Sequence, residues 1–189
     1  AARHDAINLG QGYPDTDGPE SMLAAARQAI ADGMNQYPPG AGMAVLREAV
    51  AADRNRRYGT HLDPTAEVLI TVGATEAISA TLLGLVEPGD EVVLIEPFYD
   101  SYAATVALAG AVRRTAPLVP SGSGFRLDVD ALRTAITERT TMLVVNTPHN
   151  PTGTVFTDDE IRAIAELACE HDLLVLSDEV YEHLVFDDA

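Results

Sequence analysis

The sequence predicts an α/β protein with a mostly parallel sheet that helices cover on both faces. Segments with the apolar pattern of buried strands alternate with segments of helical periodicity, at the spacing of βαβ units. The apolar run at 173–176 does not alternate with polar residues, which is typical of a strand covered on both faces. It breaks at Ser177 and Asp178, so we expect a carboxylate at the edge where open α/β sheets bind ligands.

Two helices precede the first predicted strand. Pro19 suits the first turn of a helix that ends at Gly33. A second helix ends at Gly59, and we expect the apolar residues of 46–50 to point inward.

Strands and helices then alternate along the rest of the chain. The segment 120–124 is typical of a flexible surface turn, because it is rich in Gly, Ser and Pro. We expect strands at 68–72, 91–95, near Val112, at 142–145 and at 173–176, and helices that follow the turn at 73–76, run over 101–109, begin at Asp128 and run over 158–171.

The chain is acidic, with a formal net charge of -17 over its 189 residues. Such a surface repels nucleic acid and anionic membranes, so we expect neither as a partner. No apolar run approaches the roughly 20 residues that span a bilayer, and the first residues lack the apolar core of a signal peptide. We therefore expect a cytoplasmic protein.

Cys169 is the only cysteine, which excludes a disulfide framework and a thiolate metal site built from this chain.

Lysine is missing from the composition. All 12 basic residues are arginines, the chain starts without Met, and it stops at Ala189 just after a predicted strand. We therefore expect the chain to be a piece of a longer protein.

Polar groups suited to a small ligand follow four of the predicted strands. After the first, Gly73, Ala74 and Thr75 open a helix whose free amides suit a phosphate, although a plain helix start explains them too. After the second, Tyr99 could lie flat on a planar ring, although such aromatic residues more often pack in the core.

The other two loops add hydrogen-bonding groups and charge. In the segment 146–153, Asn150 offers a donor and an acceptor, although the segment could be a purely structural turn. Asp178 and Tyr181 supply a carboxylate and a phenol, although Asp178 alone could cap the next element. Together the four loops fit pyridoxal phosphate, which is a phosphorylated aromatic cation.

Five motifs resemble those of the class I aminotransferases of pyridoxal-phosphate fold type I, in the same order and spacing. The closest resemblance is to the kynurenine/glutamine aminotransferase branch and to the actinobacterial N-succinyldiaminopimelate aminotransferases, through the segments 96–102 and 178–187. The motifs are Asn-Leu-Gly-Gln-Gly at 8–12, Asn-Gln-Tyr at 35–37, Gly-Ala-Thr at 73–75, Asn-Pro-Thr-Gly at 150–153 and Ser-Asp-Glu-Val-Tyr at 177–181.

The resemblance implies how the cofactor ring is held. Asp178 would face the pyridine nitrogen and keep it protonated. Tyr181 and Asn150 would hydrogen-bond the phenolic oxygen, and Tyr99 would stack on the ring.

The resemblance also implies contacts at the edges of the site. The Gly-Ala-Thr motif at 73–75 would hold the phosphate, and Gly12 and Asn150 would contact the substrate carboxylate. Tyr37 would reach the phosphate in the other subunit of a homodimer. We further expect cis peptide bonds before Pro97 and Pro151.

An incomplete two-domain organisation follows from the same resemblance. Residues 1–18 would be the N-terminal segment of the small domain, and 19–189 the first part of the large, cofactor-binding domain. The Schiff-base lysine of the family lies beyond the Asp-x-x-Tyr motif, and this chain has no lysine. We therefore predict that the 189-residue chain alone is inactive.

The implied activity moves an amino group between an amino acid and a 2-oxo acid. The best match is N-succinyl-diaminopimelate with 2-oxoglutarate, in lysine biosynthesis.

Cysteine-conjugate β-lyases and other amino-acid aminotransferases share the motifs, and a cofactor-binding sensor without turnover is an alternative of another class. A nicotinamide-binding domain is disfavoured because no Gly-x-Gly-x-x-Gly follows the first strand. A cofactor-free structural domain is disfavoured because the loops converge on one ligand.

Overall fold

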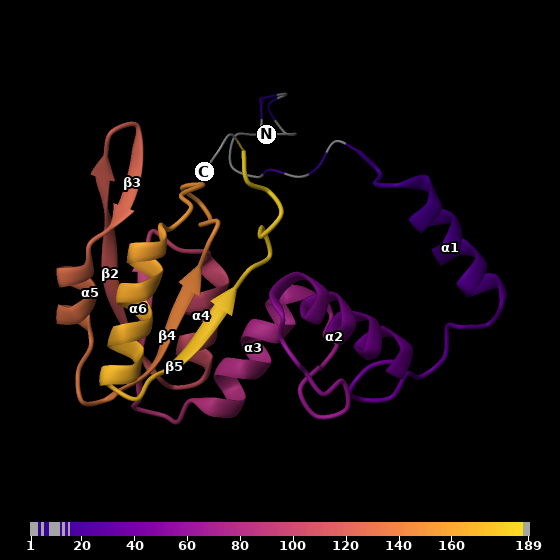
Figure 1. The fold of residues 1–189 in the computed structure, drawn as a ribbon, viewed down its shortest axis with the longest axis horizontal. Coiled ribbons are helices and arrows are strands. Elements are labelled where there is room, and N and C mark those ends of the chain that lie inside the picture. Colours follow the sequence, from indigo (N-terminus) through magenta and orange to yellow (C-terminus); the bar gives the residue numbers. More distant parts are fainter. Residues whose placement is uncertain (1–3, 5, 8–11, 13, 15, 187–189) are drawn as a thin grey trace. The chain divides into compact units, whose positions relative to one another are not determined.

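The computed structural model describes residues 4, 6–7, 12, 14 and 16–186 (Figure 1). The chain forms two compact units, Ala1–Ile70 and Thr71–Ala189. This division follows contacts within the chain, whereas the boundary predicted after residue 18 follows the domains of a family. The domain assignment therefore stays a prediction.

The first unit carries two helices. α1 (Glu20–Ala31) follows Pro19, and α2 (Ala44–Tyr58) ends at Gly59, whose φ of 67° is left-handed, so both expected helices are confirmed. The expected inward face of α2 is wrong, since Leu46 is 46% exposed. Of the residues described in this unit, only Gly42 and Ala51 are buried, so the unit has too little core of its own to cover a helix face.

The predicted strand at 68–72 is wrong. A strand needs a neighbour for its ladder of hydrogen bonds, and among the described residues one backbone bond, from Ile70 N to Ala41 O at 3.1 Å, ties this segment to another. Val72 is 88% exposed. The segment has the apolar pattern of a strand, but the described residues offer no strand to pair with it.

In the described part of the second unit, five strands form a sheet in the order β3-β2-β1-β4-β5. The pairs β1–β2, β1–β4 and β4–β5 are parallel, and β2–β3 is antiparallel, which confirms the mostly parallel sheet. The strands are β1 (Glu91–Glu96), β2 (Val112–Ser121), β3 (Gly124–Leu127), β4 (Thr140–Asn146) and β5 (Leu174–Asp178).

A hairpin between β2 and β3 replaces the flexible turn expected at 120–124. Ser121 lies opposite Gly124, and the connecting Gly122 has a φ of 58°, as tight hairpin turns require. The strand that begins at Val112 is therefore longer than expected.

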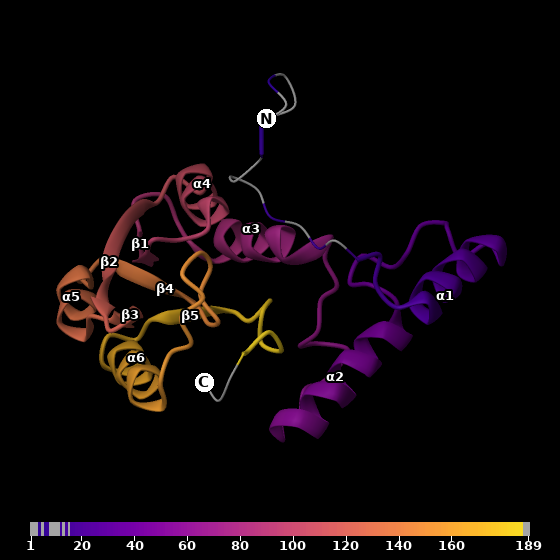
Figure 2. The same ribbon diagram turned by 90° about the horizontal axis from the view of Figure 1, so that it is seen from above.

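Helices cover both faces of the sheet, as expected (Figure 2). Alternate residues of β1 serve the two faces, with Val92 and Leu94 in one core cluster and Val93 and Ile95 in the other. The first cluster packs against α3 (Gly73–Leu85) and α4 (Asp100–Leu108), and the second against α5 (Val129–Ala135) and α6 (Asp158–Glu170).

Side-chain caps fix where α5 and α6 begin. The Asp128 carboxylate accepts a hydrogen bond of 3.0 Å from Ala131 N, which confirms the expected helix start. Thr157 and Glu160 form a capping box at the start of α6. Glu160 also accepts a hydrogen bond of 2.6 Å from Leu127 N, which ties this helix start to β3.

β5 lies at one edge of the sheet and is less covered than expected. It pairs with β4 along one side, and Leu174 and Val175 are 47% and 46% exposed. Cover on both faces is therefore a wrong expectation for these two residues, because an edge strand lacks a second neighbour. Asp178, at the end of the strand, is nevertheless buried.

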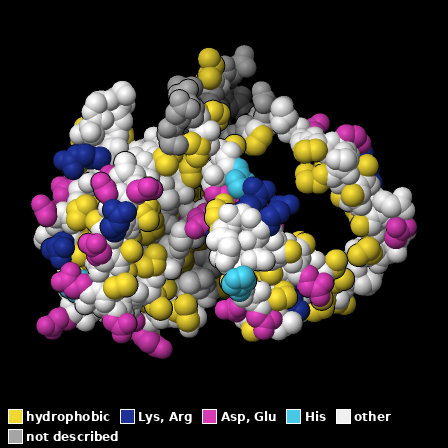
Figure 3. Space-filling view, viewed as in Figure 1, with side chains coloured by type: hydrophobic (Ala, Val, Ile, Leu, Met, Phe, Trp, Pro, Cys, Tyr) yellow, Lys and Arg dark blue, Asp and Glu magenta, His cyan; other side chains and the backbone are white. Residues whose placement is uncertain are grey.

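The surface that α5 and α6 form carries many acidic side chains, with arginines between them (Figure 3). Among the described residues, no helix is long and apolar enough to cross a membrane. No group of three or more His, Cys, Asp or Glu in that part of the chain could hold a metal ion.

Glu91, the first residue of β1, is a carboxylate with 1% of its surface exposed. It accepts hydrogen bonds from Thr137 Oγ1, at 2.7 Å, and from Arg139, and Arg114 Nε lies 3.7 Å from it. The Thr137 hydroxyl and the two arginines hold the pKa of Glu91 below its usual 4.5, although burial raises it. The cluster lies at the end of β1 away from the ligand-binding edge, so we assign it to stability.

Glu91→Gln should lower the free energy of unfolding of the full-length protein by about 1–3 kcal/mol near neutral pH, because the arginines lose their anionic partner. Since the pKa is depressed in the folded state, this stabilisation is present above pH 4.5 and is lost as the pH falls through the folded pKa. Urea unfolding at several pH values should show the wild type and the variant converging in acid. Glu138→Gln, at an exposed neighbour, is the control, and an equal loss there would refute the assignment.

Candidate functional site

One pocket collects side chains from the ends of three strands and the start of a helix. Because β1, β4 and β5 are parallel, the loops after Glu96, Asn146 and Asp178 meet at one edge of the sheet, beside the start of α3. The pocket measures ≈ 200 Å³. The predicted residues Ala74, Thr75, Tyr99, Asn150, Asp178 and Tyr181 all line it, together with Ile78, Tyr102, Asn146 and Val180.

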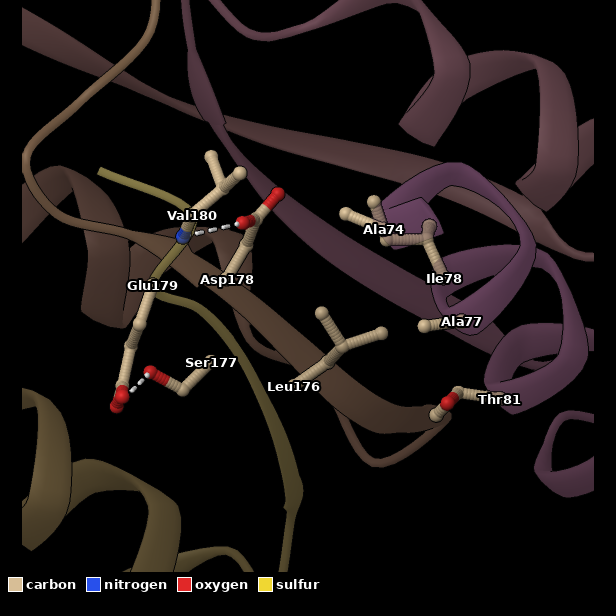
Figure 4. Close-up of a pocket in the computed structure, with 9 residues that line it drawn as sticks. All are labelled: Ala74, Ala77, Ile78, Thr81, Leu176, Ser177, Asp178, Glu179 and Val180. Carbon is tan, nitrogen blue, oxygen red and sulfur yellow. Dashed lines mark hydrogen bonds between the residues drawn. The ribbon is translucent and has the colours of Figure 1, made fainter. Parts of the chain in front are cut away.

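Asp178 is held through both carboxylate oxygens. Oδ2 accepts a hydrogen bond of 2.6 Å from the Tyr102 hydroxyl, and Oδ1 accepts one of 3.1 Å from Val180 N (Figure 4). The bond to Val180 is a local turn contact, and no helix follows it among the described residues, so Asp178 caps a turn rather than a helix. A buried carboxylate in a fixed orientation suits a cationic group on a ligand.

Tyr102 is a residue of the pocket that the sequence did not reveal. It lies on α4 and is 3% exposed. Burial, and then the bond to Asp178, raise the pKa of Tyr102 well above its usual 10, so the hydroxyl stays protonated and donates. Its position three residues after Tyr99, on one side of a helical turn, is the signal that could have found it.

Tyr99 packs in the core and also lines the pocket. Its ring meets the ring of Tyr102 edge-on, with centroids 5.8 Å apart and planes at 88°. It is half-buried against the core cluster of α3 and α4, so the packing alternative holds for one side of the ring. The side that lines the pocket is available to a planar ligand.

The start of α3 forms one side of the pocket. Gly73 has a φ of 78°, which favours glycine and turns the chain into the helix. Ala74 and Thr75 follow in the first turn, where backbone amides lack acceptors within the helix. The Glu76 carboxylate accepts a hydrogen bond from Val72 N, just before the helix.

Three proline peptide bonds near the pocket are cis. Those before Pro97 and Pro151 confirm the prediction, and the bond before Pro148 is a third that was not predicted. They lie in the loops that follow β1 and β4.

His149 connects these two loops. It is 3% exposed, and its Nδ1 lies 2.8 Å from Thr152 Oγ1. Burial lowers the pKa of His149, and hydrogen bonds to the backbone of Ile95 and Pro97 offset part of that effect. A lowered pKa favours the neutral ring, so His149 adds no charge to the site near neutral pH.

A second hollow of ≈ 290 Å³ adjoins the pocket between α3 and β5 (Figure 4). Ala77 and Thr81 of α3 and Leu176 of β5 line it. Both hollows share Ala74, Ile78, Asp178 and Val180, so the carboxylate stands where the two meet.

Gly12 and Tyr37 belong to the first unit, so their predicted contacts with the substrate and with a partner subunit stay predictions. Tyr37 is 100% exposed. Residues 8–11 of the first motif lie outside the described residues.

Comparisons of sequence identify relatives over the whole chain. The profile of the family described as aminotransferase class I and II matches residues 4–189. The chain is 64% identical, over 100% of its length, to the probable N-succinyldiaminopimelate aminotransferase DapC of Mycobacterium tuberculosis (strain H37Rv). It is 42% identical, over 98% of its length, to the methionine aminotransferase of Escherichia coli (strain K12). It covers 48% of each relative, and so spans about half of their length.

Solved structures give the same result. The N-succinyldiaminopimelate aminotransferase from Mycobacterium tuberculosis matches 100% of this chain, which covers 49% of it, with a TM-score of 0.96 and 64% identity. The aromatic aminotransferase from Pyrococcus horikoshii OT3 matches 98% of this chain, which covers 49% of it, with a TM-score of 0.92 and 40% identity. The chain therefore belongs to the class I and II aminotransferases, and its fold is that of the pyridoxal-phosphate enzymes of fold type I.

Proposed function

We propose that this chain forms the cofactor-binding part of a pyridoxal-phosphate-dependent aminotransferase, which moves an amino group between an amino acid and a 2-oxo acid. The observation that carries the proposal is the pocket itself. It places the start of α3, the Tyr99 ring and the buried Asp178 carboxylate around one space. Membership of the aminotransferase family supports the same conclusion.

The residues of the pocket fit the cofactor. Ala74 and Thr75 offer first-turn amides and a hydroxyl for the phosphate, and Tyr99 offers a ring face. Asp178 is oriented by two donors and would hold a proton on the ring nitrogen. Bound there, pyridoxal phosphate supplies an electron sink for the substrate carbon.

Asn150 and Tyr181 complete this arrangement in the proposal. Both line the pocket beside Asp178, where they would hydrogen-bond the phenolic oxygen of the cofactor. Asn150 and Gly12 would also contact the substrate carboxylate.

The substrate we propose is N-succinyl-diaminopimelate, with 2-oxoglutarate as the amino acceptor, in lysine biosynthesis. The support is the 64% identity to a relative whose name states that activity. A relative named for methionine is 42% identical, so the similarity favours the first substrate.

We also propose that the enzyme is a homodimer with shared sites. The fully exposed Tyr37 would contact the cofactor phosphate in the partner subunit. A two-fold pair is the commonest assembly of soluble oligomers.

The test compares the full-length protein with the 189-residue chain. Purified with pyridoxal phosphate, the full-length protein should show cofactor absorbance and form glutamate from N-succinyl-diaminopimelate and 2-oxoglutarate. The 189-residue chain should form none, because it has no lysine to bond the cofactor. Full-length protein without cofactor absorbance would refute the proposal, and turnover by the 189-residue chain would refute the need for a lysine beyond it.

A further inference from the structure

We propose that Asn146 is a positioning residue that fixes Asn150 relative to Asp178. The inference rests on the proposed function, because it concerns the alignment of two groups that would hold the same cofactor. Asn146 is the last residue of β4 and lies directly beside Asp178 in the register of the sheet.

The Asn146 side chain bridges the two loops with both ends of its carboxamide. Its Nδ2 donates a hydrogen bond of 2.9 Å to Asp178 O, and its Oδ1 accepts one of 2.7 Å from Asn150 N. The first contact spans 32 positions of sequence, so it joins loops that the backbone does not connect locally. The side chain therefore sets the spacing between the backbones of Asn150 and Asp178.

The bridge works in one orientation. A flipped carboxamide would set its oxygen against the Asp178 carbonyl and its NH₂ group against the Asn150 amide, so both contacts would become repulsive. Asn146 is 4% exposed, so water cannot easily replace either partner. An aspartate would lose the donor, and a leucine would lose both bonds.

The other contacts of Asp178 do not perform this task. Tyr102 and Val180 hold the Asp178 carboxylate, but these two hydrogen bonds do not link Asp178 to the loop that carries Asn150. Removal of the Asn146 carboxamide would take away the hydrogen-bonding partner of the buried Asp178 carbonyl and of the half-buried Asn150 amide, and the two loops could then shift apart. A misalignment of this kind weakens both cofactor binding and turnover.

The test uses Asn146→Ala in the full-length protein, alone and combined with Asp178→Asn. We expect the Kd for pyridoxal phosphate to rise about tenfold, and kcat to fall by at least a similar factor. Because Asn146 would act through Asp178, the change in Kd should shrink to about twofold or less in the Asp178→Asn background. If the alanine variant does not fold, Asn146→Ser, which keeps one hydrogen-bonding group, replaces it in the same cycle.

Thr140→Ala is the matched control. Thr140 begins the same strand, is buried, and uses its side chain to accept a hydrogen bond of 2.9 Å from Thr137 N. This variant should lower the unfolding temperature but leave the Kd for the cofactor unchanged.

The outcomes separate the two proposals. A raised Kd that depends on Asp178 supports the positioning role. An Asn146→Ala variant that only loses stability, as Thr140→Ala does, or that changes Kd equally in both backgrounds, overturns it while the proposed function stands. A wild-type protein that binds no pyridoxal phosphate refutes the proposed function, and this inference with it.

Discussion

Asp178→Asn in the full-length enzyme should lower kcat by about 10²- to 10³-fold, the size of effect expected when one preorganised electrostatic partner is removed. The carboxylate is buried and oriented by Tyr102 and Val180, and in the proposed complex it would keep the ring nitrogen of the cofactor protonated. An amide of the same shape keeps the packing but not the charge. Single-turnover kinetics with the amino donor should show a slow proton-transfer step and a KM that changes less than kcat.

The control for this prediction lies just before the same strand. Asp172 precedes β5 at its other end and is exposed, so Asp172→Asn makes the same chemical change away from the pocket. Its kcat should equal that of the wild type. If the kcat of Asp178→Asn stays within about threefold of the wild-type value, the role assigned to Asp178 is wrong.

Gly42→Ala should lower the free energy of unfolding of the full-length protein by about 2–5 kcal/mol. Gly42 has a φ of 92°, and a left-handed backbone costs a non-glycine residue about 1–2 kcal/mol. A Cβ at this position would also lie 2.5 Å from Ile70 Cβ and Cγ1. Overpacking of this kind adds about 1–3 kcal/mol, because the atoms it meets are close to the backbone of Ile70.

Gly40 offers a matched control in the same loop. An alanine Cβ there would meet nothing within 4 Å, so Gly40→Ala should leave the unfolding midpoint almost unchanged. Urea unfolding of both variants measures the difference. Equal midpoints would show that the chain near Gly42 rearranges without cost.

The strands and helices of the sheet could be predicted where local pattern and packing agree. β1 and β4 have continuous apolar runs because helices cover both of their faces, and Asp128 marks a helix start through its own side chain. The segment 68–72 has a similar apolar run but no neighbouring strand in the part of the chain that the structure describes, and a sequence pattern does not report which strand pairs with which. The exposure of β5 could not be predicted either, because its position at the edge of the sheet follows from the order of the strands and not from its own sequence.

Most of the residues that line the pocket could be predicted because parallel strands end at one edge. That rule places the residues after β1, β4 and β5 together without any knowledge of side-chain geometry. The sequence analysis did not identify Tyr102, Asn146 and His149, because their roles depend on hydrogen bonds to distant parts of the chain. The contact of Tyr102 with Asp178 spans 76 positions, so its spacing from Tyr99 could have pointed to the pocket but not to Asp178 as its partner.

The positions of α3 and β5 give the pocket an electrical polarity. The positive end of α3 lies at one side of it, and the Asp178 carboxylate lies at another. A molecule with one negative and one positive end gains attraction at both only when it enters in a single direction, and a reversed molecule meets repulsion twice. The pocket therefore favours one orientation of such a molecule over the reverse.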